Sequence, residues 1–251
     1  MAQLDGRVVL VTGASSGLGA RFARIAAAAG AKVVAGARRA DRLAELVDSI
    51  AASGSEAIPV SLDVTDEASV RAAYDVAEAR FGPVDSVVAN AGVNATGRST
   101  DLDVADFDAV FAVNVRGVFL TAREAAKRMQ ASGGADRGRI VLISSITAHM
   151  QTNGTAPYSA SKSAVTHLGK MLAKEWARTG PNVSVVSPGY IRTELAGDFF
   201  DSDAGQKQVA RWPRRRLLDD DALDATVLYL LSDASAGVTG SEFVIDDGQS
   251  L

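Results

Sequence analysis

The chain has 251 residues, of which 47% are hydrophobic and 22% are charged, and its formal net charge is −4. This composition is typical of a globular protein, and an acidic balance without a basic stripe argues against nucleic acid as a partner. The chain has no cysteine and only two histidines, which excludes disulfides and thiolate chemistry and predicts that the protein holds no metal.

Membrane and export signals are also missing from the sequence. It contains no run of about 20 apolar residues, the length that a membrane-spanning helix needs. The first residues, MAQLDGR, lack the apolar core of a signal peptide. Together with the lack of cysteine, these features predict a cytoplasmic protein that does not contact a membrane.

Short apolar strands alternate with helices along the whole chain. The predicted strands cover residues 7–12, 31–36, 57–62, 84–89, 140–143, 183–186 and 242–245. The predicted helices cover about 19–30, 41–52, 66–80, 157–178 and 222–231, with two more helices between 104 and 129 around Asn114. Strands that are apolar on both faces and separated by helices are typical of a parallel sheet covered on both sides. We therefore predict an α/β fold: one doubly wound Rossmann domain over residues 1–251, with a mainly parallel seven-stranded sheet.

The first strand runs directly into a glycine-rich turn, TGASSGLG at residues 12–19, that opens a helix. Glycines let the backbone turn tightly and approach a pyrophosphate, whose charge then lies against the helix N-terminus. An ordinary turn is the alternative, but the position between a first strand and a helix favours dinucleotide binding. The predicted contacts are Gly13, Ser15, Ser16, Gly17, Leu18 and Gly19.

The end of the second strand indicates which dinucleotide binds. An acidic residue there accepts a hydrogen bond from the ribose 2′-hydroxyl of NAD, whereas the 2′-phosphate of NADP is bound by arginine. Here Arg38 and Arg39 follow the strand, and no acid occurs before Asp41. Guanidinium groups pair well with phosphate, so the sequence favours NADP(H), with NAD(H) and plain surface arginines as the alternatives.

A second polar stretch follows the fifth strand. Ser145 lies just after it, and Tyr158 and Lys162 lie four residues apart inside a helix that begins near Pro157. Side chains with this spacing share one helix face. We expect the Lys162 ammonium to lower the pKa of the Tyr158 phenol, ordinarily about 10, toward the range of acid–base catalysis. Ser145 could then hydrogen-bond the substrate oxygen; the alternative is an ordinary helix with a surface lysine.

The sequence contains seven short motifs, in this order along the chain: TGASSGLG at 12–19, Asp63-Val64, Asn90-Ala91-Gly92, Asn114, Ser145, Tyr158-x-x-x-Lys162 and Pro188-Gly189. In this order they resemble, over the full length of the chain, the short-chain dehydrogenase/reductase family. The branch with chains of this length includes 3-oxoacyl-carrier-protein reductases and many secondary alcohol and hydroxysteroid dehydrogenases. The fourth-strand motif usually carries a second asparagine, where this chain has Ala89.

The resemblance implies a role for each catalytic position. Tyr158 would be the general acid in ketone reduction and the base in alcohol oxidation. Lys162 would lower the pKa of Tyr158 and hold the nicotinamide ribose, and Ser145 would orient the carbonyl group. Asn114 would hold a water that relays protons to Lys162; the alternative for Asn114 is a buried structural amide.

The resemblance also implies the remaining cofactor contacts. Asp63 and Val64 would contact the adenine, although Asp63 could instead cap a helix. Asn90, Ala91 and Gly92 would line the cofactor cleft. The nicotinamide end would be held by Pro188, Gly189, Ile191 and Thr193, with a surface hydroxyl as the alternative for Thr193.

The implied reaction is hydride transfer between NADP(H) and a ketone or secondary alcohol, with a 3-oxoacyl, alicyclic or other apolar carbonyl compound as the small-molecule substrate. Two rival hypotheses are a dinucleotide-binding redox sensor without catalysis and a sugar-nucleotide dehydratase or epimerase. The complete set of catalytic residues argues against the sensor, and the short C-terminal segment argues against the sugar-nucleotide enzyme.

Residues 194–213 correspond to the mobile substrate loop of the family and contain Phe199, Phe200 and Trp212. These aromatics either wall an apolar pocket or pack against a neighbouring subunit. The helix from Pro157 and the C-terminal segment resemble interface elements of the family, so a homotetramer is expected. The basic cluster of Arg211 and residues 214–216 is followed by acidic residues 219–221, which favours a solvated or interface patch over a phosphate site.

Overall fold

The computed structural model describes residues 3–192 and 198–251. Its centre is a sheet of seven strands in the order β3-β2-β1-β4-β5-β6-β7, and every neighbouring pair is parallel. The strands are β1 (Val8–Thr12), β2 (Lys32–Ala37), β3 (Ala57–Ser61), β4 (Ser86–Ala89), β5 (Arg139–Ile143), β6 (Asn182–Pro188) and β7 (Glu242–Ile245). The predicted doubly wound α/β fold is confirmed, and the sheet is wholly rather than mainly parallel.

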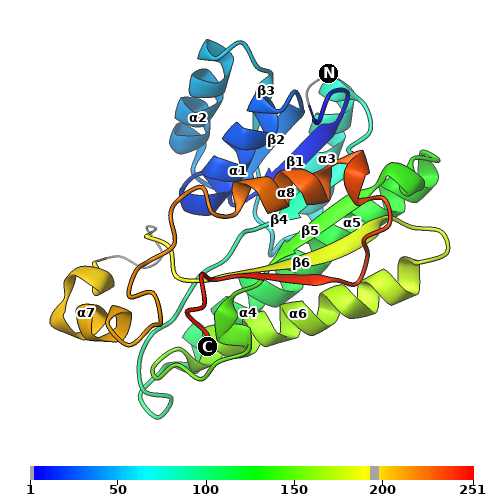
Figure 1. Ribbon diagram of the computed structural model, residues 1–251. Helices are drawn as coiled ribbons and strands as arrows, with labels where there is room; N and C mark the ends of the chain where they lie inside the picture. Colours follow the sequence, from blue (N-terminus) through cyan, green and yellow to red (C-terminus); the bar gives the residue numbers. More distant parts are fainter. Residues whose placement is uncertain (1–2, 193–197) are drawn as a thin grey trace.

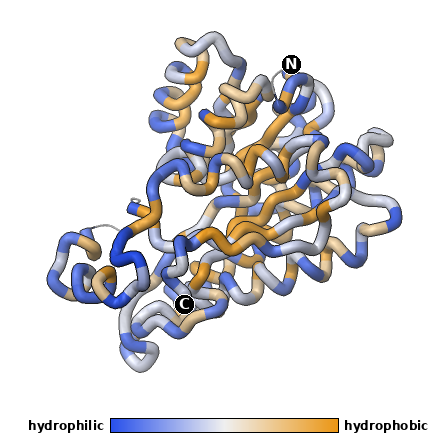
Figure 2. Tube along the Cα trace, viewed as in Figure 1, coloured by the Kyte–Doolittle hydropathy of each residue, from blue (hydrophilic) through white to orange (hydrophobic). Residues whose placement is uncertain are grey.

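Helices cover both faces of the sheet (Figure 1). One face packs against α1 (Gly17–Ala28), α2 (Ala40–Ala52) and α8 (Asp224–Leu231), and the other against α3 (Glu67–Phe81), α5 (Val118–Ala131) and α6 (Ala156–Trp176). Successive residues of β1 point to opposite faces of the sheet. Leu10 packs in the core beside α3, α5 and α6, whereas Val9 and Val11 pack in the core beside α1, α2 and α8. Both faces of the strands are therefore apolar, and Figure 2 shows hydrophobic residues concentrated along the central strands.

Two regions differ from the prediction. Instead of two separate helices around Asn114, α4 (Val104–Phe111) continues through a π-helical turn (Ala112–Gly117) into α5. The backbone packs closely there, since a Cβ atom on Gly117 would lie 2.6 Å from Val64 Cγ2. The predicted substrate loop, residues 194–213, contains α7 (Asp203–Val209), which projects at the left of Figure 1.

The topology determines where a site can form. In a parallel sheet the carboxyl ends of all strands lie along the same side, here called the carboxyl edge. The direction in which successive strands are added to the sheet reverses between β1 and β4. Loops from these two strands run to opposite sides, which opens a crevice at the carboxyl ends. The motifs that follow β1, β2, β4, β5 and β6 are thereby brought together at that edge.

Candidate active site

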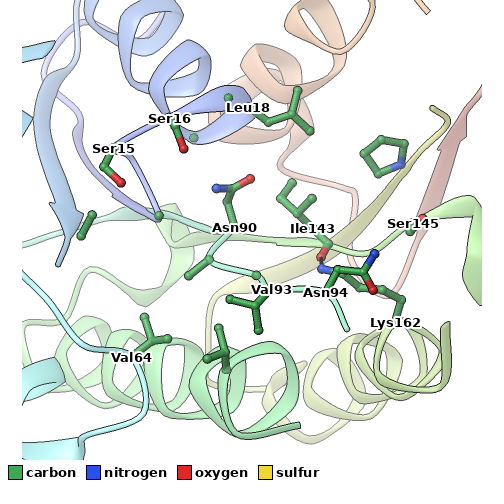
Figure 3. Close-up of a pocket in the computed structure, with 18 of the residues that line it drawn as sticks. Ser15, Ser16, Leu18, Val64, Asn90, Val93, Asn94, Ile143, Ser145 and Lys162 are labelled. Atoms are coloured by element: carbon green, nitrogen blue, oxygen red, sulfur yellow. Dashed lines mark hydrogen bonds between the residues drawn. The ribbon is translucent and has the colours of Figure 1, made fainter. Parts of the chain in front are cut away.

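A cleft of about 510 Å³ lies at the carboxyl edge of the sheet (Figure 3). Its wall includes three of the four predicted catalytic residues, Ser145, Tyr158 and Lys162, while Asn114 lies behind it. Thr193 lies outside the described residues. All other predicted cofactor residues line the cleft: Gly13, Ser15, Ser16, Gly17, Leu18, Gly19, Arg38, Arg39, Asp63, Val64, Asn90, Ala91, Gly92, Pro188, Gly189 and Ile191.

The glycine-rich turn forms a cradle that only glycine permits. Gly13 has φ +68°, in the left-handed region, and a Cβ atom there would lie 2.8 Å from Ala91 Cα. A Cβ atom on Gly19 would lie 2.2 Å from the Gly13 carbonyl oxygen. Ser16 is the N-cap of α1 but its side chain accepts no capping hydrogen bond, so the first N–H groups of α1 face the cleft without that partner. This cradle fits a pyrophosphate group.

The two arginines after β2 differ in their surroundings. Arg39 donates from Nε to Ser15 Oγ at 3.1 Å and from Nη2 to Ser16 Oγ at 2.6 Å. Arg38 is exposed at the cleft, and its charge contributes to the lowered pKa of Asp63. Both arginines therefore face the same end of the cleft as the glycine-rich turn.

The carboxylate of Asp63 is held by Thr65. Its Oδ1 accepts from Thr65 N at 2.9 Å and from Thr65 Oγ1 at 2.7 Å, and these bonds are the main cause of its lowered pKa. The N-cap of α3 is Asp66, whose carboxylate accepts from Ala68 N and Ser69 N. The alternative of Asp63 as the helix cap is therefore wrong.

Asn90 joins β1 to β4 below the cleft. Thr12 Oγ1 accepts from Asn90 N at 3.0 Å and from Ala91 N at 3.1 Å, and Asn90 Nδ2 donates to Thr12 O at 3.0 Å. The loop after β4 is thus fixed against the strand that carries the glycine-rich turn.

Asn114 is fully buried in the π-helical turn and holds the chain beside the cleft. Its Oδ1 accepts from Val93 N at 2.8 Å, and its Nδ2 donates to Val93 O at 3.0 Å and to Ser161 Oγ at 2.9 Å. This geometry is that of a structural amide. The proton-relay role that the resemblance implies stays a prediction.

Tyr158 and Lys162 reach the cleft from the first turns of α6, and Ser145 reaches it from the end of β5. Lys162 Nζ lies 5.6 Å from the centroid of the Tyr158 ring and donates to Ile143 O at 2.8 Å. Ser145 Oγ accepts from Thr147 N at 3.2 Å and from Thr147 Oγ1 at 3.0 Å. The three predicted side chains therefore lie on one wall.

The pKa of the Tyr158 phenol differs from the prediction. Burial raises the pKa of Tyr158 to about 12, although a hydrogen bond with Ser145 acts in the opposite direction. Burial also lowers the pKa of Lys162 to about 8. The expected lowering of the phenol pKa is therefore wrong for this structure, because desolvation disfavours the charged form of both groups.

Comparison with known proteins decides the family. The sequence profile of the short chain dehydrogenase family matches residues 7–204. The chain belongs to the short-chain dehydrogenase/reductase family. It is accordingly an NAD(P)-dependent oxidoreductase that acts on CH–OH groups, and the hypothesis of a redox sensor without catalysis is set aside.

Two curated relatives and one solved structure illustrate the likeness. This short-chain dehydrogenase is 35% identical to D-threitol dehydrogenase of Mycolicibacterium smegmatis, over 99% of this chain and 95% of the relative. It is 38% identical to cis-4-hydroxycyclohexanecarboxylate dehydrogenase of Sinomonas cyclohexanicum, over 96% of each chain. A gluconate 5-dehydrogenase from Burkholderia cenocepacia, solved in complex with NADP and tartrate, is 35% identical with a TM-score of 0.93, over 99% of this chain and 96% of that one.

The aromatic residues of the predicted substrate loop pack on each other. Phe200 and Trp212 are buried, and Trp212 stacks on Tyr190 with ring centroids 5.3 Å apart. Phe200 meets Tyr190 edge to face at 5.5 Å. The loop aromatics do not line the described cleft; Tyr190 does, and Phe199 is exposed. For Phe200 and Trp212, both alternatives given by the sequence are therefore wrong, because their contacts are within the chain. Glu194 and the other loop residues through 197 lie outside the described ranges.

The short-chain dehydrogenase has a C-terminal clamp that sequence reasoning missed. Gln249 is 4% exposed, and its Oε1 accepts from Tyr190 N at 2.6 Å. Its Nε2 donates to Tyr190 O and to Arg216 O, both at 3.2 Å. Arg214 and Arg216 pair with Asp247 at 3.1 and 2.8 Å, not with the acidic residues 219–221 that follow them. The end of the chain thereby holds the segments on both sides of α7.

Three further polar residues that line the cleft were not assigned to it from the sequence: Ser144, Thr147 and Tyr190. Their position in the sequence could have indicated them, since each one directly follows or neighbours a predicted motif. Within the described ranges, no group of three or more acidic or histidine residues could hold a metal ion. Among the helices described, none combines the length and apolarity that crossing a membrane requires.

Proposed function

We propose that this short-chain dehydrogenase interconverts a secondary alcohol and the corresponding ketone with NADP(H), and that Tyr158 is its general acid and base. The observation that carries the proposal is the convergence of Ser145, Tyr158 and Lys162 on one wall of the cleft that begins at the glycine-rich turn. The names of two relatives, D-threitol dehydrogenase and cis-4-hydroxycyclohexanecarboxylate dehydrogenase, agree with a secondary alcohol as substrate.

Ser145, Tyr158 and Lys162 each have a separate role in the proton transfer. In reduction, the Tyr158 hydroxyl donates its proton to the carbonyl oxygen, and in oxidation the phenolate accepts the alcohol proton. Ser145 Oγ accepts two hydrogen bonds from Thr147 and directs its own proton to the side of Tyr158, where it would also bond the substrate oxygen. The Lys162 ammonium, near the Tyr158 ring, stabilises the phenolate when it forms. Asn114 would hold the water that returns protons toward Lys162.

The nicotinamide of the cofactor supplies or accepts the hydride. The residues that would hold the cofactor run from the glycine-rich turn through Asp63 and Val64 to Pro188, Gly189 and Ile191. Preference for NADP(H) rests on Arg38, which is exposed at the cleft and can pair with a 2′-phosphate, and on Arg39 beside it. The NADP complex of the Burkholderia cenocepacia relative supports this choice.

We further propose a homotetramer in which α6 and the C-terminal segment form contacts between subunits. Strand β7 is at the edge of the sheet, and Val244 on β7 and Met171 on α6 are 48% and 42% exposed. A sedimentation profile that contains only monomer would contradict the tetramer. A cytoplasmic location stays a prediction from the cysteine-free composition.

The test is a fluorescence titration with NADPH and NADH, followed by a panel of ketones and secondary alcohols. Tyr158→Phe should reduce turnover by at least about a thousandfold and leave cofactor affinity within about twofold of wild type. Tyr229→Phe on α8 is the matched control and should retain full activity. Full turnover by Tyr158→Phe would refute the assignment of the general acid.

A further inference from the structure

The cleft contains one carboxamide whose oxygen is not hydrogen-bonded by any residue that the structure describes. Asn94 lines the cleft, and its Oδ1 is buried without a hydrogen-bond partner among the described residues. The neighbouring asparagines behave differently: Asn90 bonds to Thr12, and Asn114 bonds to Val93 and Ser161. Buried polar atoms in native proteins are nearly always paired, so the exception at Asn94 calls for a reason.

The backbone before Asn94 is fixed in place. Asn114 holds both the N–H and the carbonyl group of Val93, at 2.8 and 3.0 Å. Asn94 therefore has a defined position beside the reacting groups, and Figure 3 shows its amide extending toward the side of the cleft on which Ser145 lies. An amide held in this way is preorganised for a ligand.

The lining near Asn94 is polar and mostly uncharged. Apart from Lys162, which donates to Ile143 O, the described polar side chains at this end are neutral. They are Asn94, Ser144, Ser145, Thr147, Tyr158 and Tyr190. Arg38, Arg39 and Asp63 belong to the opposite end, near the glycine-rich turn. A carboxylate or phosphate on the substrate would find no free cation in this part of the described wall.

We propose that Asn94 is a specificity-determining residue that binds a second hydroxyl group of the substrate, and that the substrate is an uncharged polyol or the hydroxy ketone formed from it. The inference rests on the proposed secondary-alcohol chemistry and narrows its substrate class. A hydroxyl both donates and accepts, so it can satisfy the amide in either orientation about χ2. The proposal replaces the apolar carbonyl compound expected from the sequence, since Phe200 and Trp212 pack against Tyr190 rather than around the cleft.

The test compares substrates that differ by one hydroxyl group: 2,3-butanediol with 2-butanol, and 1,2-cyclohexanediol with cyclohexanol, each with NADP⁺. Wild type should oxidise the diols with kcat/KM at least about tenfold higher, because a site built to bond a hydroxyl rejects the analogue that lacks it. Asn94→Leu removes the amide at similar volume. It should lose about 10- to 100-fold on the diols and less than about threefold on the mono-alcohols.

Two controls separate recognition from damage to the fold. Asn153→Leu makes the same chemical change on an exposed residue that does not line the described cleft, and it should match wild type. NADPH titration of Asn94→Leu should give the wild-type affinity. If Asn94→Leu fails to fold, Asn94→Ser, with a shorter hydrogen-bonding side chain, should retain only part of the preference for diols.

Three outcomes would overturn the inference. Equal kcat/KM of wild type for diols and mono-alcohols would show that no second hydroxyl is recognised. Equal losses of Asn94→Leu on both substrate classes would show that Asn94 does not discriminate between them. Failure of wild type to oxidise any alcohol or reduce any ketone, despite cofactor binding, would refute the proposed function and the inference with it.

Discussion

The Lys162 ammonium donates to the main-chain carbonyl oxygen of Ile143, with Nζ and O 2.8 Å apart. Lys162 is 3% exposed, and within the described ranges no carboxylate forms an ion pair with it. A carbonyl dipole compensates only part of the hydration that a buried ammonium loses, and burial lowers the pKa of Lys162 to about 8. The cleft therefore holds a positive charge at a cost to the stability of the fold.

This cost predicts that Lys162→Met stabilises the protein at neutral pH. The pKa of lysine is about 10.4 in the unfolded chain and lower in the fold, so between pH 8 and 10.4 the unfolded state binds more protons and stability rises with pH. The full penalty, on the order of 3 kcal/mol, applies below pH 8. Lys162→Met should raise the free energy of unfolding by about 1–3 kcal/mol at pH 7, and the gain should shrink by pH 9.5. Urea unfolding measures both, with the exposed Lys174→Met as control.

The raised pKa of Tyr158 predicts different pH profiles for the two directions of the reaction. Oxidation requires the phenolate, and with a pKa of about 12 its fraction grows about tenfold per pH unit. Between pH 6 and 7, where Lys162 stays mostly charged, kcat/KM for alcohol oxidation should rise with this slope. Ketone reduction uses the phenol and should stay nearly constant. Steady-state kinetics in both directions measure the slopes, and a flat oxidation profile would contradict the role of Tyr158.

Much of this architecture follows from the sequence alone. Each apolar run is short, is followed by a helix and lacks polar alternation, which predicts a parallel sheet buried on both faces. Parallel strands end at one edge, so motifs that follow different strands must meet there. The clustering of the glycine-rich turn with Asn90 and Tyr158 follows from that geometry. Local spacing also predicted correctly that Tyr158 and Lys162 share one face of a helix.

Other features depend on tertiary packing that spacing does not encode. The distance between Tyr158 and Lys162 was predictable, but their pKa values depend on how completely water is excluded. Arg214 and Arg216 pair with Asp247 although acidic residues stand nearer in sequence, because the chain end folds back over this segment. That Asn94 Oδ1 has no partner in the described part of the chain is visible only once the hydrogen bonds of the surrounding residues are known.

The exposure of Arg38 predicts a selective loss of NADPH affinity in Arg38→Ala. A 2′-phosphate adds two negative charges at this end of the cleft, and the guanidinium gives charge-assisted hydrogen bonds that NADH cannot use. The Kd for NADPH should rise about 10- to 100-fold, and that for NADH by less than about threefold. Fluorescence titration measures both constants. Arg42→Ala, on the exposed side of α2, is the control and should change neither, whereas equal losses for both cofactors in Arg38→Ala would remove Arg38 as the phosphate ligand.

The clamp of Gln249 on Tyr190 predicts that the C-terminus positions the wall of the cleft. In Gln249→Ala, Tyr190 N loses its 2.6 Å partner, so its ring and the stacked Trp212 should shift. We expect the substrate KM to rise about tenfold with a smaller change in kcat. The fluorescence emission of Trp212, measured in a Trp176→Phe background, should change as well. Gln249→Glu keeps the accepting oxygen, so it should bring both the KM and the emission part of the way back to the wild-type values. Leu251→Ala is the control, since that side chain is 96% exposed. Unchanged KM and unchanged emission in Gln249→Ala would show that Tyr190 is held without the clamp.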